Sequence, residues 1–282
     1  IMDQETYEGY ERYIYIGIAI LVIIIVLYYL TRKNNEFDIV ITWVDWSNKH
    51  FVQKMIEAGG RSEGCDVGEF MELKYLLRSL VTNNIPYRNI YIVYSDNHPP
   101  PKFLQETSNL FFIKHSQIVK DPTNLPLIHR ETIVSHLHNI PGLSRYFFYI
   151  EDDIIVNDKD IFKEVLNDYV SNNIVTGILP ITLNPPYNVR EPMGLWYHCT
   201  SNSINLIETK IPYKQTHHIV LLDKDILTHL DQKFPTHMKV TQSYKNQKTE
   251  ISKEPYLIST IDLHFNYLIH KKGYTYSDYV IK

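Results

Sequence analysis

Hydrophobic residues along this chain fall into short apolar runs separated by stretches with helical spacing. Apolar runs rich in β-branched and aromatic residues, and too short for helices, predict buried strands. The four predicted strands are residues 37–44, 89–94, 110–114 and 146–150. Elsewhere apolar residues recur at three- and four-residue spacing, which predicts amphipathic helices. The predicted helices are residues 69–83, 128–140, 158–170, 223–234 and 259–271.

The alternation of strands and helices predicts the fold class. Strands that alternate with helices build an α/β fold with a mostly parallel sheet and flanking helices on both faces. No low-complexity stretch or internal repeat divides the chain after its first residues, so residues 37–282 are predicted to form one domain. In open parallel sheets, ligands bind beyond the carboxyl ends of the strands. A site is therefore expected at that edge.

The N-terminal part has a different pattern. Residues 13–30 carry no charge and have tyrosines near both ends, which is typical of a transmembrane helix. The preceding tail, residues 1–12, is acidic, unlike the basic start of a cleavable signal peptide. Residues 31–36 are predicted to be a linker. We therefore expect a single-pass membrane protein.

The side of the membrane is less clearly indicated. Arg32 and Lys33 follow the predicted span and only Arg12 precedes it, which favours a cytosolic catalytic domain. The sequence has no Asn-x-Ser/Thr sequon, in agreement with that side. A lumenal domain stays an alternative.

Among the 282 residues, 44% are hydrophobic and 21% charged, as in a globular protein with a full core. The net charge of −4 indicates no nucleic-acid partner, and nothing indicates an oligomeric state.

Carboxylates follow three of the four predicted strands. Asp45 ends the first, Asp96 follows the second, and Glu151, Asp152 and Asp153 follow the fourth. The carboxyl ends of parallel strands share one edge of a sheet, so these acids are expected to lie near one another. Two adjacent carboxylates suit Mg²⁺ or Mn²⁺ shared with phosphate oxygens. An acidic turn that caps the following helix is the alternative interpretation.

Basic residues and histidines offer further candidates. Lys74 and Arg78 are spaced i,i+4 on a predicted helix, with Glu72 on the other flank of its leucine stripe. Either this set contacts phosphate or it is an ordinary solvated surface. Likewise His217, beside His218, is a candidate general base or part of an exposed loop. The sequence contains no glycine-rich phosphate-binding loop, so a nucleotide would have to be held by metal and side chains.

Several stretches, in this order, carry a family resemblance. They are Ile-Thr-Trp-Val-Asp-Trp-Ser (41–47), Glu-Leu-Lys-Tyr-Leu-Leu-Arg-Ser (72–79), His-Leu-His-Asn-Ile-Pro-Gly-Leu-Ser (136–144) and Tyr-Ile-Glu-Asp-Asp (149–153). The chain resembles the Stealth family of sugar-phosphate transferases, which includes capsule polysaccharide phosphotransferases and the catalytic subunit of the lysosomal-enzyme N-acetylglucosamine-1-phosphotransferase. A weaker similarity runs from Thr216-His217-His218 to Lys224, and the whole match spans roughly residues 37–270.

This resemblance implies a glycosyltransferase-A-like fold, a nucleotide-sugar donor such as UDP-N-acetylglucosamine, and a glycan or glycoprotein acceptor. Sugar-1-phosphate would move to an acceptor hydroxyl and a nucleoside monophosphate would leave. The implied catalytic residues are Asp45, Arg78 and His217. The implied substrate-binding residues are Thr42, Trp43, Glu72, Lys74 and Asp96. The implied ligands of Mg²⁺ or Mn²⁺ are Asp152 and Asp153.

The chain departs from the family pattern at three places. Glu151 stands where the family has asparagine, and residues 127–130 replace a Thr-Phe-Asn-Ser-like stretch. The family's last motif carries an arginine, but this chain has none after Arg190. Two alternatives therefore stay open: a metal-dependent glycosyltransferase that releases a nucleoside diphosphate, and an inactive binding protein with the same fold.

Overall fold

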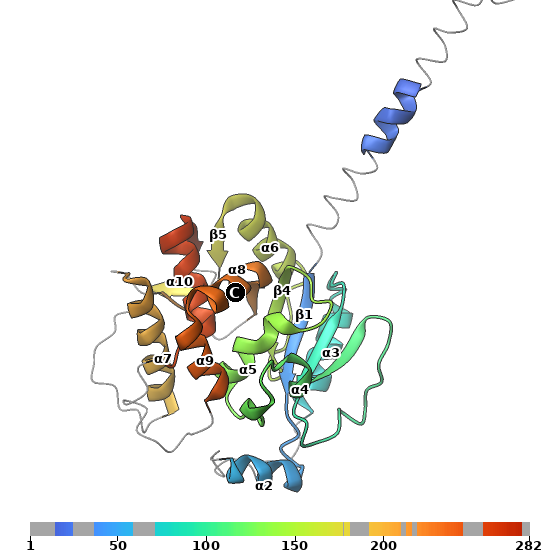
Figure 1. The fold of residues 1–282 in the computed structure, drawn as a ribbon. Coiled ribbons are helices and arrows are strands. Elements are labelled where there is room, and N and C mark those ends of the chain that lie inside the picture. The colour runs from blue at the N-terminus through green and yellow to red at the C-terminus, as the bar shows by residue number, and fades with distance from the viewer. Residues whose placement is uncertain are drawn as a thin grey trace, which may run out of the picture. The chain divides into compact units, whose positions relative to one another are not determined.

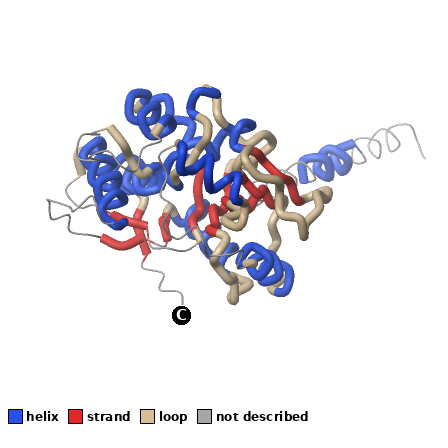
Figure 2. The backbone as a smooth tube through the Cα atoms, turned by 90° about the horizontal axis from the view of Figure 1, so that it is seen from below, coloured by secondary structure: helices blue, strands red, loops and turns tan. Residues whose placement is uncertain are grey.

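A computed structural model describes residues 15–24, 37–58, 71–176, 178–180, 192–209, 213–215, 219–244 and 256–277. The chain divides into two compact units, residues 1–36 and 37–282. The second unit is built round one mostly parallel sheet. This confirms the predicted α/β class, with flanking helices that Figure 2 shows around the strands.

The central sheet has the strand order β3-β2-β1-β4-β8. Its strands are β1 (Phe37–Trp43), β2 (Ile90–Tyr94), β3 (Leu110–Lys114), β4 (Tyr146–Glu151) and β8 (Val220–Asp223). The first four strands are parallel, with Ile41 of β1 opposite Ile92 of β2 and Ile150 of β4. Strand order therefore reverses at β1, which has β2 on one side and β4 on the other. A reversal of this kind leaves a crevice at the carboxyl ends.

Helices cover both faces of the sheet (Figure 1). On β4, Phe148 packs against Phe162 of α6 (Ile161–Asn172), while the next side chain, Tyr149, lies under Arg130 of α5 (Arg130–His136). Because successive strand residues point to opposite faces, α6 and α5 cover opposite faces. Helix α3 (Glu72–Thr82) is bonded to the loop before α6, where Ser79 Oγ accepts from the Val156 N–H at 3.0 Å.

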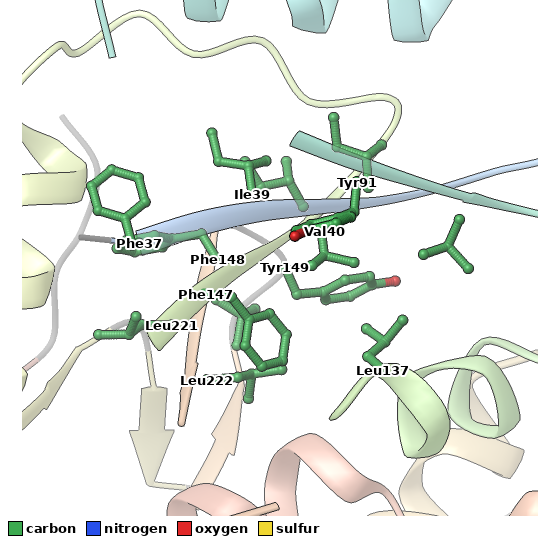
Figure 3. Close-up of a cluster of buried hydrophobic side chains, with 14 of the residues drawn as sticks. Phe37, Ile39, Val40, Tyr91, Leu137, Phe147, Phe148, Tyr149, Leu221 and Leu222 are labelled. Carbon is green, nitrogen blue, oxygen red and sulfur yellow. The ribbon is translucent and has the colours of Figure 1, made fainter. Parts of the chain in front are cut away.

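The core forms where these layers meet. Figure 3 shows Phe147, Leu222 and Tyr149 on the side of the sheet that faces Leu137. Phe37 and Phe148 pack edge to face, with ring centroids 4.9 Å apart. On α3 the predicted leucine stripe is buried, as expected from its spacing. Burial of these large apolar side chains is the main term that holds sheet and helices together.

The other described elements extend this core. They are α2 (Lys49–Glu57), α4 (His115–Ile118), β5 (Ile174–Thr176), β6 (Ile178–Pro180), α7 (Pro192–Ile207), β7 (Tyr213–Gln215), α8 (Lys224–Lys233), α9 (Pro235–Ser243), α10 (Thr260–Lys272) and β9 (Thr275–Ser277), with short 3₁₀ turns at Pro122–Asn124 and Leu137–Asn139. Strands β5 and β9 pair in parallel, and β6 and β7 pair in antiparallel. Helix α10 packs against α7, α5 and α8, as the crossing helices in Figure 1 show.

Strand β8 and the start of helix α6 are among the details that differ from the sequence prediction. Strand β8 was not predicted, and it joins the sheet antiparallel to β4, with Leu222 opposite Phe147. Its four buried residues are too few for a periodicity signal. Helix α6 begins after Asp160 instead of at Asp158, whose carboxylate accepts from the Asp160 N–H at 2.9 Å and forms a turn ahead of the helix.

At the amino end of the sheet, Asp38 of β1 is fully buried and surrounded by donors. Arg88 donates to both carboxylate oxygens, from Nε at 2.9 Å and Nη2 at 2.6 Å. The backbone N–H groups of Asn89 and Ser144 donate at 3.1 and 2.6 Å. This cluster ties β1 to the segments that lead into β2 and β4.

In the first unit, residues 15–24 form a helix with exposed apolar side chains, such as Ile16 and Leu21. The remainder of the predicted span 13–30 and the linker 31–36 lie outside the described residues. Within the ranges that the structure describes, no helix combines the length and the apolar composition needed to cross a bilayer.

Candidate active site

A pocket of about 370 Å³ opens at the carboxyl ends of β1 and β4, at the predicted edge of the sheet. Thr42, Trp43 and Val44 contribute from β1 and the residue after it, and Tyr149 and Glu151 from β4. The pocket therefore lies where the strand order reverses. Apolar side chains of Phe51 and Met55 on α2, and of Leu127, Ile128 and Ile133 near α5, complete its walls.

Four carboxylates line this pocket. Glu151, Asp152 and Asp153 follow one another at the end of β4, and Glu72 is the first residue of α3. Burial raises the pKa of Asp152 to about 7, and the negative charges of Glu72, Asp153 and Glu151 add to that rise, against a lowering hydrogen bond from the Asp152 backbone. The predicted metal ligands and Glu72 are thus brought together, in a crowded arrangement that a bound cation would relieve.

The carboxylates suit a hard divalent ion shared with phosphate. Within the described ranges, no three His, Cys, Asp or Glu side chains are already gathered as a ligand set. Mg²⁺ is usually bound by one or two carboxylates together with waters and substrate phosphates, so a complete protein cage is not required. The four carboxylates that line the pocket fit that mode, and the negative charges of the other three add to the rise that burial gives to the pKa of Asp152.

Arg130 also lines the pocket and carries a positive charge beside these acids. Its Nε lies 2.6 Å from Oε1 of Glu151. The guanidinium carbon is 5.8 Å from the centroid of the Tyr149 ring. Tyr149 is fully buried, its hydroxyl lies 3.2 Å from Thr42 Oγ1, and burial raises its pKa to about 12. The floor of the pocket is therefore a neutral phenol with a cation beside it.

Asp45 lies at the edge of this pocket, between the lining residues Val44 and Trp46. One of its carboxylate oxygens accepts from the N–H and the hydroxyl of Ser47. Its own N–H donates to Nε2 of His98 at 3.4 Å, and Nδ1 of His98 lies 2.9 Å from the Pro99 carbonyl. Burial lowers the pKa of His98, so the ring is neutral and holds the loop after β1 in place.

Other predicted residues lie elsewhere. Asp96 is exposed, and its carboxylate accepts from the N–H and hydroxyl of Ser116 at the start of α4. Lys74 and Arg78 are on α3 but are not among the described residues that line the pocket. His217 lies outside the described residues. The structure therefore gathers Thr42, Trp43, Glu72, Asp152 and Asp153, with Asp45 at the rim.

Sequence reasoning passed over several lining residues. Arg130 stood in a stretch noted for its departure from the family, Tyr149 looked like an ordinary core aromatic, and Trp46 was part of a motif without a role. A signal existed for Arg130 alone, since it lies in the first turn of the predicted helix 128–140. Only the fold shows that this helix crosses over β4.

Comparison with known proteins finds a similarity that covers part of this pocket. Residues 67–173, which contain Glu72, Arg130, Tyr149 and the three successive acids, match the family model described as Stealth protein CR2, conserved region 2. Over these residues the chain is similar to the Stealth family. The residues that line the pocket lie within this matched region, apart from Thr42, Trp43 and the other residues contributed by β1 and α2.

Two relatives show how far the similarity along the chain extends. An exopolysaccharide phosphotransferase of Streptomyces coelicolor is 34% identical over 131 residues, which are 44% of this chain and 22% of the relative. The capsular polysaccharide phosphotransferase SacB of Neisseria meningitidis serogroup A is 29% identical over 220 residues, or 73% of this chain and 39% of the relative. The chain thus spans about a fifth to two fifths of the length of these relatives. A solved 4-diphosphocytidyl-2C-methyl-D-erythritol synthase from Anaerococcus prevotii aligns with a TM-score of 0.39 and 9% identity over 87% of each chain.

Proposed function

We propose that this chain is a sugar-1-phosphate transferase. Its donor would be a nucleotide-sugar such as UDP-N-acetylglucosamine, and its acceptor a hydroxyl group of a glycan or glycoprotein. The observation that carries the proposal is the gathering of four carboxylates, Asp152 and three others, in a pocket at the reversal of a parallel sheet. The names of both relatives, which are polysaccharide phosphotransferases, support the same reaction class. A glycosyltransferase-A-like arrangement of the domain is part of this proposal.

In this reaction the acceptor oxygen forms a bond to the phosphorus that carries the sugar. The bond between that phosphorus and the bridging anhydride oxygen breaks, and the nucleoside monophosphate leaves with this oxygen and the electron pair of the bond. The acceptor hydroxyl loses its proton to a general base, a role that we assign to His217. Such transfers depend mostly on positioning and on charge stabilisation, which suits a site built from acids and a few polar groups.

The remaining residues take the following roles in the proposal. Asp152 and Asp153 hold Mg²⁺ or Mn²⁺, which would offset the negative charge of the diphosphate and stabilise the leaving phosphate. Thr42, Trp43 and Glu72 orient the donor and acceptor from the pocket wall, and Asp45 acts from the rim. Lys74, Arg78 and Asp96 keep the roles that the resemblance implies, as contacts for parts of the substrates that extend beyond the pocket.

The test is to identify the nucleotide that is released. The full chain, purified in detergent, is incubated with a panel of nucleotide-sugars, Mg²⁺ or Mn²⁺ and an acceptor glycan, and nucleotides are separated by chromatography. Metal-dependent release of a nucleoside monophosphate, abolished by Asp153→Ala, is expected. Release of a nucleoside diphosphate would instead identify a glycosyltransferase. Absence of any release above Asp153→Ala would identify an inactive binding protein.

Membrane anchoring also stays a prediction, based on the uncharged sequence 13–30. In this proposal the catalytic domain lies on the cytosolic side. Extraction of cell membranes separates the alternatives: an anchored chain resists alkaline washing and dissolves only in detergent. Protease treatment of sealed vesicles then reports the side on which residues 37–282 lie.

A further inference from the structure

The charges that line the pocket are strongly unbalanced. Four carboxylates face the cavity, while Arg130 is the only lysine or arginine among the described lining residues. A diphosphate would add further negative charge to this pocket. A divalent ion offsets part of that charge, but the donor also needs a directional contact that fixes its phosphates. The pocket therefore has one described side chain that can supply a charge-assisted hydrogen bond to phosphate from the protein itself.

Arg130 is held in place from two sides. Its Nε contacts Glu151 at 2.6 Å, and its guanidinium lies over the ring of Tyr149, 5.8 Å from the centroid. The ring of Tyr149 is fixed in position, because it is fully buried and its hydroxyl is hydrogen-bonded to Thr42. The side chains of Arg130 and Glu151 each keep 28% of their surface exposed. The cation is thus pre-positioned, yet it stays accessible from the cavity.

A carboxylate and a phosphate present similar oxygen pairs to a guanidinium group. Arginine binds both through parallel N–H donors, and phosphate carries the greater charge. We infer that Arg130 is the anion-binding residue for the donor diphosphate, and that Glu151 occupies the position of a phosphate oxygen while the pocket holds no donor. This inference rests on the proposed function and adds a residue that the family resemblance does not assign.

The inference makes Glu151 a competitor of the donor. Binding of the diphosphate separates Arg130 from Glu151. The free energy needed to separate this pair makes donor binding weaker than it would be without Glu151. Removal of the Glu151 charge should therefore tighten donor binding, whereas removal of the Arg130 charge should weaken it. Opposite effects at two residues in contact would not arise if the pair only stabilised the fold, because then both substitutions would act in the same direction.

The experiment measures nucleotide affinity by isothermal titration calorimetry on the full chain in detergent. UDP, CDP, GDP and ADP are titrated in turn with Mg²⁺ present, and the tightest ligand is used for all variants. Arg130→Gln should raise Kd roughly ten- to hundredfold, the usual worth of a charged hydrogen bond. Arg130→Lys should raise Kd less, because an ammonium keeps the charge without the fork. Glu151→Gln should lower Kd.

The matched control is Lys163→Gln, which removes an exposed cation from α6 on the other face of the sheet. It should leave Kd unchanged, so a change there would show that overall charge, not Arg130, determines affinity. Far-ultraviolet circular dichroism reports whether each variant is folded. If Arg130→Gln does not fold, Arg130→Lys and Glu151→Gln still test the inference, because they must shift Kd in opposite directions.

The outcomes separate this inference from the proposed function. Unchanged Kd in Arg130→Gln, or weaker binding in Glu151→Gln, would overturn the inference even if the wild type releases nucleoside monophosphate. Nucleotide binding that depends on Arg130, without release of monophosphate from any donor, would support the inference and count against sugar-phosphate transfer. A wild type that binds none of the four diphosphates would contradict both.

Discussion

Asp38 and Asp152 are acids at opposite ends of the same sheet, and their surroundings could hardly differ more. Asp38, at the amino end, receives four hydrogen bonds, two from Arg88 and two from backbone N–H groups. Asp152, at the carboxyl end, has three other carboxylates as its charged neighbours in the pocket, and burial raises its pKa to about 7. One acid is given partners by the fold, and the other is placed among like charges.

This difference separates a structural acid from a functional one. When a buried charge has a full set of hydrogen-bond donors, removal of one partner destabilises the fold. Such a charge is not available to a ligand. An acid crowded by other acids costs stability, and such a cost is typical of a binding or catalytic site. Residue type and strand position do not distinguish the two acids, whereas their partners do.

The strongest test of this comparison is Asp152→Asn. Turnover should fall at least about a hundredfold, as when other electrostatic groups of an active site are removed. Thermal stability should not fall with it: the melting temperature at pH 8 should rise, because the substitution removes one charge from a crowded, partly buried group. Differential scanning calorimetry and the nucleotide-release assay give the two readouts on the same sample.

Asp158→Asn is the matched control for Asp152→Asn. Asp158 lies in the same loop, is exposed, and accepts from the Asp160 N–H through Oδ1, which an asparagine can also do. Its activity and melting temperature should stay at the wild-type values. A lower melting temperature for Asp152→Asn would show that Asp152 stabilises the fold as Asp38 does, and the comparison would fail.

Asp38→Asn should give the reverse pattern. An asparagine offers one acceptor oxygen to donors that now share two, and its amide group faces the Arg88 guanidinium. The free energy of unfolding should fall by about 3 kcal/mol, the cost of breaking a well-bonded, largely buried charge pair. Urea denaturation measures this change. Molecules that stay folded should keep wild-type turnover, so a loss of activity per folded molecule would contradict a purely structural role.

His264 extends the comparison to a buried base. It is fully buried on α10, its Nε2 accepts from the Asp223 N–H at 3.2 Å, and burial lowers its pKa to about 3. The unfolded chain therefore binds a proton more readily than the folded one between pH 6.5 and 3, and stability must fall as pH falls through that window. From pH 7 to pH 5, one such histidine lowers the free energy of unfolding by about 2 kcal/mol.

The variant His264→Gln isolates this contribution, since the glutamine oxygen can still accept from the Asp223 N–H. Other buried histidines, such as His115 and His136, have pKa values lowered in the same direction and stay in both proteins. The wild type should thus lose more stability between pH 7 and pH 5 than the variant. Equal slopes in urea denaturation at the two pH values would show that His264 is not held neutral.

Much of the fold was predictable because periodicity reports burial. The strands β1, β2, β3 and β4 and the leucine face of α3 follow from apolar spacing and were found within a few residues. Strand β8 was missed, because four residues give no period and because its antiparallel pairing depends on β4, far away in the chain. Helix α2 was missed too, although Phe51, Val52, Met55 and Ile56 recur in it at helical spacing.

The candidate site was predictable only in part. Asp152 and Asp153 follow from the rule that ligands bind at the carboxyl ends of strands, Thr42 was given by the family resemblance, and all three line one pocket. That rule treats every strand end alike, so it also selected Asp96. It could not find Arg130, whose position depends on how α5 crosses β4, a tertiary contact that no local pattern contains.

The substitution Asp96→Asn is expected to have the smallest effect on activity and stability, and its outcome best distinguishes a structural acid from a functional one. It follows β2 as Asp152 follows β4, yet its carboxylate accepts from the Ser116 N–H at 3.0 Å and it is not among the described lining residues. Asp96→Asn should lower the free energy of unfolding by about 1 kcal/mol, the worth of one such capping contact. Turnover and KM for the donor should change less than about twofold, which corresponds to about half a kcal/mol, if the substrates contact only residues of the pocket.

A large rise in KM with normal stability would instead show that the substrates also contact the end of β2, outside the pocket, as the family resemblance implies. The presence of a hydrogen-bond partner would then not be enough to classify a carboxylate as structural. An acid bonded to one serine can exchange that serine for a substrate hydroxyl, whereas an acid with four donors, such as Asp38, cannot.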